Sequence, residues 1–151
     1  MNNKKTKIKQ LIKKLKMAEE IYKRASIKVH DRPMTEYFAA LANKKNGFID
    51  TLVANSQLGQ ENVSIGVKDR FRVEMEKIGI EVNSILIRLN EFELMDFCIK
   101  REEELVSMYQ NVLNEYDDQD FVEKMILDQL VYSKDILIRL NEKKDTYEYK
   151  Y

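Results

Sequence analysis

The chain has 151 residues, 44% hydrophobic and 34% charged, and its 26 basic and 26 acidic side chains leave no net charge. That length suits one domain with a substantial core, so we expect residues 1–151 to form a single domain. The charge balance gives no overall field to attract nucleic acid or an acidic substrate. One proline and four glycines are too few for the turns of a many-stranded fold and favour an all-α protein.

Cys98 is the only cysteine, which excludes an internal disulfide and a zinc site built from several thiolates and suits a reducing compartment. The Lys-rich N-terminus has no continuous apolar segment of the kind that a signal peptide or a membrane span requires. We therefore expect a cytoplasmic protein.

The first predicted helix runs from about Lys4 to Val29, because its apolar positions alternate at spacings of three and four residues. Glu19 borders the apolar face. The opposite, Lys-rich face could lie on an anionic membrane. We prefer a solvated face, because Glu19 and Glu20 interrupt the basic run and no Trp or Phe anchors the apolar side. The apolar positions are Ile8, Leu11, Leu15, Ala18, Tyr22, Ala25 and Val29.

Pro33 fixes its own φ and disfavours helix at the residue before it, so a turn is expected at 30–33. A second helix is predicted from about Met34 to Asn55. Lys45 occupies one of its inner positions. Either its stem covers apolar neighbours while the ammonium reaches water, or the ammonium points inward at a carboxylate. The other inner positions are Met34, Phe38, Leu41, Phe48 and Leu52.

After a predicted loop at 56–62, a third periodic segment runs from about Val63 to Leu89, with Gly79 and Asn83 as places where it could bend or break. The next helix is predicted from about Glu91 to Tyr116. A carboxylate, Glu102, stands in the middle of its buried stripe. The other members of that stripe are Met95, Cys98, Leu105, Tyr109, Val112 and Tyr116.

A polar turn is predicted at 116–120, with a cap for a last helix from about Gln119 to Glu142. Residues 144–151 show no period, so we expect this tail to fray. The inner positions of the last helix are Val122, Met125, Ile126, Gln129, Tyr132, Ile136 and Leu140.

Four inward polar side chains fall at similar depths. Short turns make the first two helices antiparallel, and likewise the last two. The segment between these pairs, about 26 residues, spans roughly 40 Å as a helix and can carry the chain from one end of a bundle to the other. Counted from the turns, Glu19, Lys45 and Glu102 each lie eleven residues deep and Gln129 lies thirteen. We therefore predict that they lie at one level.

Five short motifs follow one another along the chain: Glu19-x-x-Tyr22-x-x-Ala25, Lys45-x-x-Phe48-x-x-x-Leu52, Ser64-x-Gly66 with Arg70-Phe71, Glu102-x6-Tyr109, and Gln129. In this order they resemble an uncharacterised bacterial family of four-helix-bundle proteins of unknown function within the ferritin-like superfamily. The family generally has Arg where this chain has Lys45, so a positively charged side chain stands at this position in both. The resemblance covers nearly the whole chain. It implies a ferritin-like up-down four-helix bundle with a long helical crossover between the second and third bundle helices.

Diiron members of that superfamily use one Glu from each of two helices and a Glu-x-x-His pair from each of the other two. Glu19 and Glu102 match the two single glutamates. The only histidine, His30, is predicted in a turn, and a diiron centre would lack ligands and contain an ammonium. The resemblance therefore implies a degenerate metal site. The positions of the two missing pairs carry Ala42 with Lys45, and Gln129 with Tyr132.

Our first hypothesis replaces the metal with a polar core cluster, in which an ammonium offsets the repulsion of two buried carboxylates. The protein is then a non-enzymatic helical bundle without catalytic residues or cofactor, acting as a stress-related or partner-binding module. The predicted cluster consists of Glu19, Lys45, Glu102 and Gln129, with Tyr22, Tyr109 and Tyr132 as nearby donors.

The alternative is a carboxylate-based site for one divalent metal ion, formed by Glu19, Glu102 and Gln129, with residual ferritin-like or oxidase-like activity. Lys45 argues against it. A third hypothesis uses the surface: the Lys-rich face would contact anionic lipid or an acidic partner, and a Tyr-rich tail would dock onto another subunit of a homo-oligomer. Ordinary surface roles explain both features, and the sequence identifies no protein partner. The tail tyrosines are Tyr147, Tyr149 and Tyr151.

Overall fold

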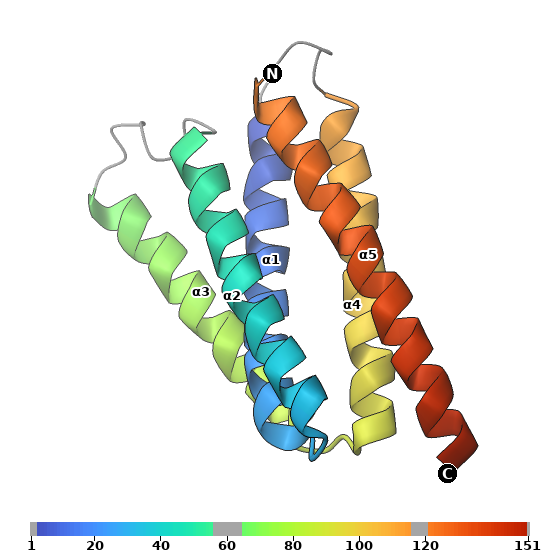
Figure 1. The fold of residues 1–151 in the computed structure, drawn as a ribbon. Helices are drawn as coiled ribbons and strands as arrows, with labels where there is room; N and C mark the ends of the chain where they lie inside the picture. The colour runs from blue at the N-terminus through green and yellow to red at the C-terminus, as the bar shows by residue number, and fades with distance from the viewer. Residues whose placement is uncertain (1–2, 56–64, 116–120, 151) are drawn as a thin grey trace. The chain divides into compact units, whose positions relative to one another are not determined.

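The computed structural model describes residues 3–55, 65–115 and 121–150. These residues form helices without any strand, which confirms the predicted all-α class (Figure 1). No helix among them is long and apolar enough to cross a membrane. The helices are α1 (Asn3–Lys28), α2 (Arg32–Asn55), α3 (Ile65–Leu86), α4 (Glu91–Leu113) and α5 (Phe121–Lys150).

Some predictions fall where the structure gives no description. The expected loop at 56–62 and the expected turn at 116–120, including Tyr116, lie outside the described residues, as do Ser64 and Tyr151. The side chains of Gly66, Arg70, Phe71 and Tyr149 are likewise not described.

The chain divides into two compact units. One is Ile12–Arg88, which holds most of α1 with α2 and α3; the other joins Met1–Leu11 to Leu89–Tyr151 and holds α4 and α5. The single-domain organisation expected from the length stays a prediction.

In the Ile12–Arg88 unit, α1 and α2 are antiparallel across the predicted turn. Pro33 lies in the first turn of α2, where its missing N–H interrupts no helical hydrogen bond. Tyr22 and Phe38, each seven residues from the turn, stack with ring centroids 5.8 Å apart. Every apolar position predicted for the first helix is buried, so the three-four pattern identified its inner face correctly.

Helix α3 runs parallel to α1, because contacts between them progress in the same order along both helices. Lys13 pairs with Glu74 at 2.9 Å, and Lys28 Nζ donates to the carbonyl oxygen of Leu86 at 2.7 Å. Of the predicted possibilities, a bend or a break at Gly79 or Asn83, a break is absent, since α3 continues through both residues. Gly79 instead lies against the side chain of Glu20, whose Cδ would be 3.6 Å from a Cβ placed there.

In the second unit, α4 begins where the sequence indicated. Asn90 forms a capping box with Glu93: the Glu93 N–H donates to Asn90 Oδ1 at 2.8 Å, and the Asn90 N–H donates to Glu93 Oε1 at 3.1 Å. Helices α4 and α5 pack against each other. They are antiparallel, because Asp96 meets Lys144 whereas Tyr109, further along α4, meets the earlier Gln129.

The end of α5 differs from the predicted frayed tail. The helix continues through Lys150 instead of ending near Glu142. Lys144 pairs with Asp96 at 2.9 Å and its Nζ lies 5.6 Å from the centroid of the Phe92 ring, while Tyr147 is buried. Contacts with another helix can hold a segment helical without a regular apolar period in its sequence.

The Asp96–Lys144 ion pair should make the stability of the protein depend on pH. Hydrogen bonds from Lys144 and Lys100 hold the pKa of Asp96 below its usual value. The Asp96 carboxylate therefore binds a proton more readily in the unfolded chain than in the folded one. The ion pairs of Asp96 therefore stabilise the fold above about pH 4, and this stabilisation is lost as the pH falls through the pKa of Asp96 in the folded chain.

We expect Asp96→Asn to lower the Tm at neutral pH and to converge with the wild type in acid, as measured by circular dichroism. Asp135→Asn is the matched control, because Asp135 is exposed and pairs with Arg139 at 2.9 Å within its own helix, α5. If Asp96→Asn lowered the Tm as much in acid as at neutral pH, the stabilising role of the Asp96 charge would be contradicted.

Candidate functional site

Two buried hydrogen bonds join α4 to α5. The Ser133 hydroxyl donates to Glu102 Oε2, and both residues are 0% exposed. The Tyr109 hydroxyl donates to Gln129 Oε1 at 2.8 Å. Glu102 and Tyr109 are two helical turns apart and share one face of α4. Three of the predicted site residues, Glu102, Tyr109 and Gln129, therefore lie on facing sides of one helix pair.

The carboxylate of Glu102 affects the groups around it. Burial and then the negative charge of Glu102 raise the pKa of both Cys98 and Tyr109. Cys98 is thus a buried, protonated thiol, which is a packing residue and a poor nucleophile. Tyr109 stays neutral at physiological pH and can keep donating to Gln129.

Ser133 is a member of these buried hydrogen bonds that the sequence prediction missed. The predicted donor near this position was Tyr132, which is only half-buried. Burial, Asp135 and, more weakly, Glu102 raise the pKa of Tyr132. Ser133 follows Gln129 by four residues and so lies on the same face of α5, and this spacing was the available signal.

In the Ile12–Arg88 unit, Glu19 is paired along its own helix. It is 3% exposed, and its two oxygens lie 3.1 Å from Lys16 Nζ and 3.1 Å from Lys23 Nζ. Burial alone would lower the pKa of Lys16, but its hydrogen bonds and ion pairs with Glu19 and Glu20 outweigh that effect and raise it. The polar edge of α1 is therefore held by local ion pairs.

Lys45 on α2 is 0% exposed. Its Nζ lies 5.9 Å from the centroid of the Phe48 ring, near enough for a cation–π contact. The ammonium therefore does not extend into bulk water. The third predicted residue of this unit, Tyr22, is buried in the stack with Phe38.

Except for the half-buried Tyr132, the predicted polar residues are thus buried, each within its own unit. The further prediction that Glu19, Lys45, Glu102 and Gln129 form one cluster stays a prediction. Among the described residues, no three His, Cys, Asp or Glu side chains are grouped so that they could hold a metal ion. The alternative single-ion site, formed by Glu19, Glu102 and the Gln129 amide, stays a prediction as well.

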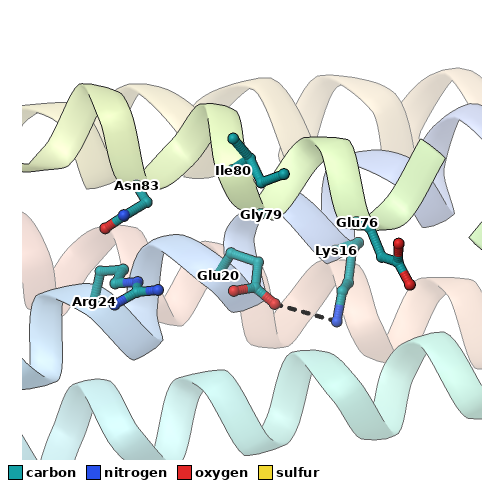
Figure 2. Close-up of a pocket in the computed structure, with 7 residues that line it drawn as sticks. All are labelled: Lys16, Glu20, Arg24, Glu76, Gly79, Ile80 and Asn83. Atoms are coloured by element: carbon teal, nitrogen blue, oxygen red, sulfur yellow. Dashed lines mark ion pairs between the residues drawn. The ribbon is translucent and has the colours of Figure 1, made fainter. Parts of the chain in front are cut away.

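An open groove of about 520 Å³ lies between α1 and α3 in the Ile12–Arg88 unit (Figure 2). The ion pair drawn within it joins Lys16 to Glu20 at 3.2 Å. Its lining combines charged groups, one amide and an exposed isoleucine, without a Ser, Cys or His. The groove is not predicted from the sequence, because the Lys-rich face of the first helix has the pattern of an ordinary solvated surface. The lining residues are Lys16, Glu20, Arg24, Glu76, Gly79, Ile80 and Asn83.

No protein-family model matches this chain, and neither a curated protein nor a solved structure matches it. The ferritin-like resemblance therefore depends on the short motifs quoted above. A function has to be inferred from the side chains themselves.

Proposed function

We propose that this chain is a non-enzymatic helical bundle of ferritin-like type that acts as a partner-binding module, with buried Lys, Glu and Gln side chains in place of a metal centre. The observation that supports this most is the pair of buried hydrogen bonds between α4 and α5. Such polar contacts fix how two helices pair, because a shifted register would leave a buried carboxylate or amide without its partner.

The burial of these groups argues against catalysis. A nucleophile or general base must come within hydrogen-bonding distance of its substrate. The Ser133 hydroxyl is used in donating to Glu102, and the thiol of Cys98 is buried and protonated. These buried groups therefore contribute to the stability of the fold and to the correct pairing of α4 with α5.

The surface supports the partner-binding part of the proposal. Large aliphatic side chains are strongly exposed at intervals of seven residues on α5 (Val131 and Ile138) and from α3 to the residue just after it (Ile80 and Ile87), so each pair shares one helix face that a partner could cover. The most exposed aliphatic side chains of the described residues are Ile27 at 77%, Ile87 at 72%, Ile80 at 71%, and Val131 and Ile138 at 60% each.

Metal analysis of protein purified without chelator tests this proposal. We expect far less than one metal ion per chain, and a Tm that does not change with a chelator or with added Fe²⁺, Mn²⁺ or Zn²⁺. Glu103→Ala is the matched control for Glu102→Ala, because Glu103 is the exposed neighbour. A stoichiometric metal that is lost in Glu102→Ala and kept in Glu103→Ala would overturn the proposal in favour of the single-ion site.

A further inference from the structure

We propose that residues 87–90, which join α3 to α4, are a hinge through which two copies of this chain exchange their α4–α5 pairs. In the exchanged dimer, α3 and α4 form one continuous helix. A repeated sequence, the contacts that hold the turn and the division of the chain into units support this exchange. The exchange does not depend on the non-enzymatic role proposed above.

The hinge lies inside a seven-residue sequence that the chain contains twice. Ile-Leu-Ile-Arg-Leu-Asn-Glu stands at 85–91 and again at 136–142. At 136–142 all of it is helical, within α5. At 85–91 helix α3 ends at Leu86 and α4 begins at Glu91. Since no glycine or proline stands in this sequence, it is compatible with helix, and residues outside it decide whether a turn forms.

Contacts from outside the repeat hold the turn. The Lys28 ammonium donates to the carbonyl oxygen of Leu86 at 2.7 Å. A continuing helix would use this oxygen for its own hydrogen bond. The Asn90 side chain accepts from the Glu93 N–H at 2.8 Å, in the capping box that starts α4. Opening these contacts would therefore release the residues that a continuous helix needs.

The second repeat uses the same asparagine differently. Asn141 takes the place of Asn90, and its amide donates to the carbonyl oxygen of Leu137 at 2.8 Å, along the helix. Lys144 takes the place of Glu93, and an ammonium has no acceptor with which to complete a capping box. The same seven residues are thus helix or turn according to what surrounds them. A turn of this kind is a suitable hinge.

The hinge also contains the boundary between the two compact units, which falls after Arg88. The unit beyond this boundary consists of two separate pieces of chain, Met1–Leu11 and Leu89–Tyr151. An ion pair joins these pieces, with Lys7 Nζ 2.7 Å from Glu115 Oε1. A unit built from separate pieces can be completed by a piece of a second copy, which is the arrangement called domain swapping.

A continuous α3–α4 helix would separate these pieces within one chain. At 1.5 Å per residue, Glu115 would lie about 40 Å beyond Leu86 along the common axis. Because α1 is parallel to α3, Lys7 would lie near the opposite end. The Lys7–Glu115 pair would then form only between two copies, each giving its α4–α5 pair to the other. The balance between monomer and dimer therefore depends on the hinge and on protein concentration.

Sedimentation velocity of the full chain tests the dimer, after incubation at high concentration near the Tm and cooling. We expect a slowly exchanging dimer. Asn90→Ala removes a helix cap and adds a good helix former, and each dimer contains two hinges. It should raise the association constant at least about tenfold. Asn141→Ala is the matched control, because it makes the same change in the same sequence where the chain is already helical.

A second variant acts in the opposite direction. Arg88 is exposed in the turn, where glycine is tolerated, but glycine weakens a continuous helix. Arg88→Gly should therefore lower the association constant by about tenfold. Circular dichroism establishes that all three variants keep their helices.

Zero-length cross-linking with a carbodiimide tests the exchange itself. It joins an amine to a carboxylate in contact, such as Lys7 to Glu115 at 2.7 Å and Lys144 to Asp96 at 2.9 Å. In dimers formed from a mixture of isotope-labelled and unlabelled chains, we expect Lys7–Glu115 cross-links that combine the two kinds of chain. Lys144–Asp96 cross-links are the control and should each come from one chain, because both residues move with α4–α5. Mass spectrometry of the digested dimer distinguishes them.

A chain that stays monomeric both as wild type and as Asn90→Ala would overturn the inference. A dimer whose Lys7–Glu115 cross-links each come from one chain would overturn it too, since that dimer forms without exchange. Equal association constants for Asn90→Ala and Asn141→Ala, or a dimer that Arg88→Gly leaves unchanged, would contradict the role of the hinge. Metal content is independent of these results, so failure of the exchange and failure of the non-enzymatic role are distinguishable.

Discussion

Replacing Glu102 with alanine is expected to lower the free energy of unfolding by about 3 kcal/mol, because two costs add. The buried Ser133 hydroxyl loses its acceptor on α4, and the removed side chain leaves a cavity in a fully buried position. Urea unfolding followed by circular dichroism at neutral pH measures the change.

Three further variants separate the causes of this loss. Glu102→Gln keeps the size of the side chain and an acceptor oxygen, so it should cost less than Glu102→Ala. Glu103→Ala, on the exposed face, should change stability by no more than about 0.5 kcal/mol. Glu102→Ala and Ser133→Ala should be non-additive by about 1 kcal/mol or more, since either change breaks the same bond. Additive losses would mean that the hydrogen bond contributes little.

The sequence predicted the helices well where the boundary is set by local chemistry. Pro33 marked the turn before α2, and Asn90 with Glu91 marked the start of α4, where the structure has a capping box. The buried stripes of the first helix and of α4 were also predictable, because the period of a helix decides which residues share a face. Glu102 and Tyr109 were placed on one inner face of α4 in this way. Of the inner positions predicted elsewhere, Phe48, Val122 and Met125 are only half-buried.

The missed features depend on contacts between helices. Whether α5 ends at Glu142 or Lys150 is decided by Lys144 meeting Asp96 and by the burial of Tyr147, neither of which has a periodic signal. The donor to Glu102 is Ser133, one residue after Tyr132, the nearby donor that the sequence predicted. Consecutive residues point about 100° apart on a helix, so a one-residue difference decides which one is buried.

If Lys45 belongs to the proposed polar core cluster, Lys45→Met should lower the free energy of unfolding by about 3 kcal/mol, the range for removing one member of a buried charge pair. Lysine is almost never fully buried unless its charge is compensated, and Lys45 is 0% exposed. Methionine fills much of the space of the lysine stem, so the substitution removes the charge with little loss of packing. Urea unfolding at neutral pH measures the difference.

Lys44→Met is the matched control, because Lys44 is exposed and its Nζ lies 5.6 Å from the centroid of the same Phe48 ring. It should change stability by no more than about 0.5 kcal/mol. Lys45→Arg keeps the positive charge and should cost less than Lys45→Met, although the larger guanidinium must be accommodated. If Lys45→Met were as stable as the wild type, packing of the stem would explain the residue. A substantial loss that Arg largely avoids would show that a buried positive charge is required, as the polar core cluster predicts.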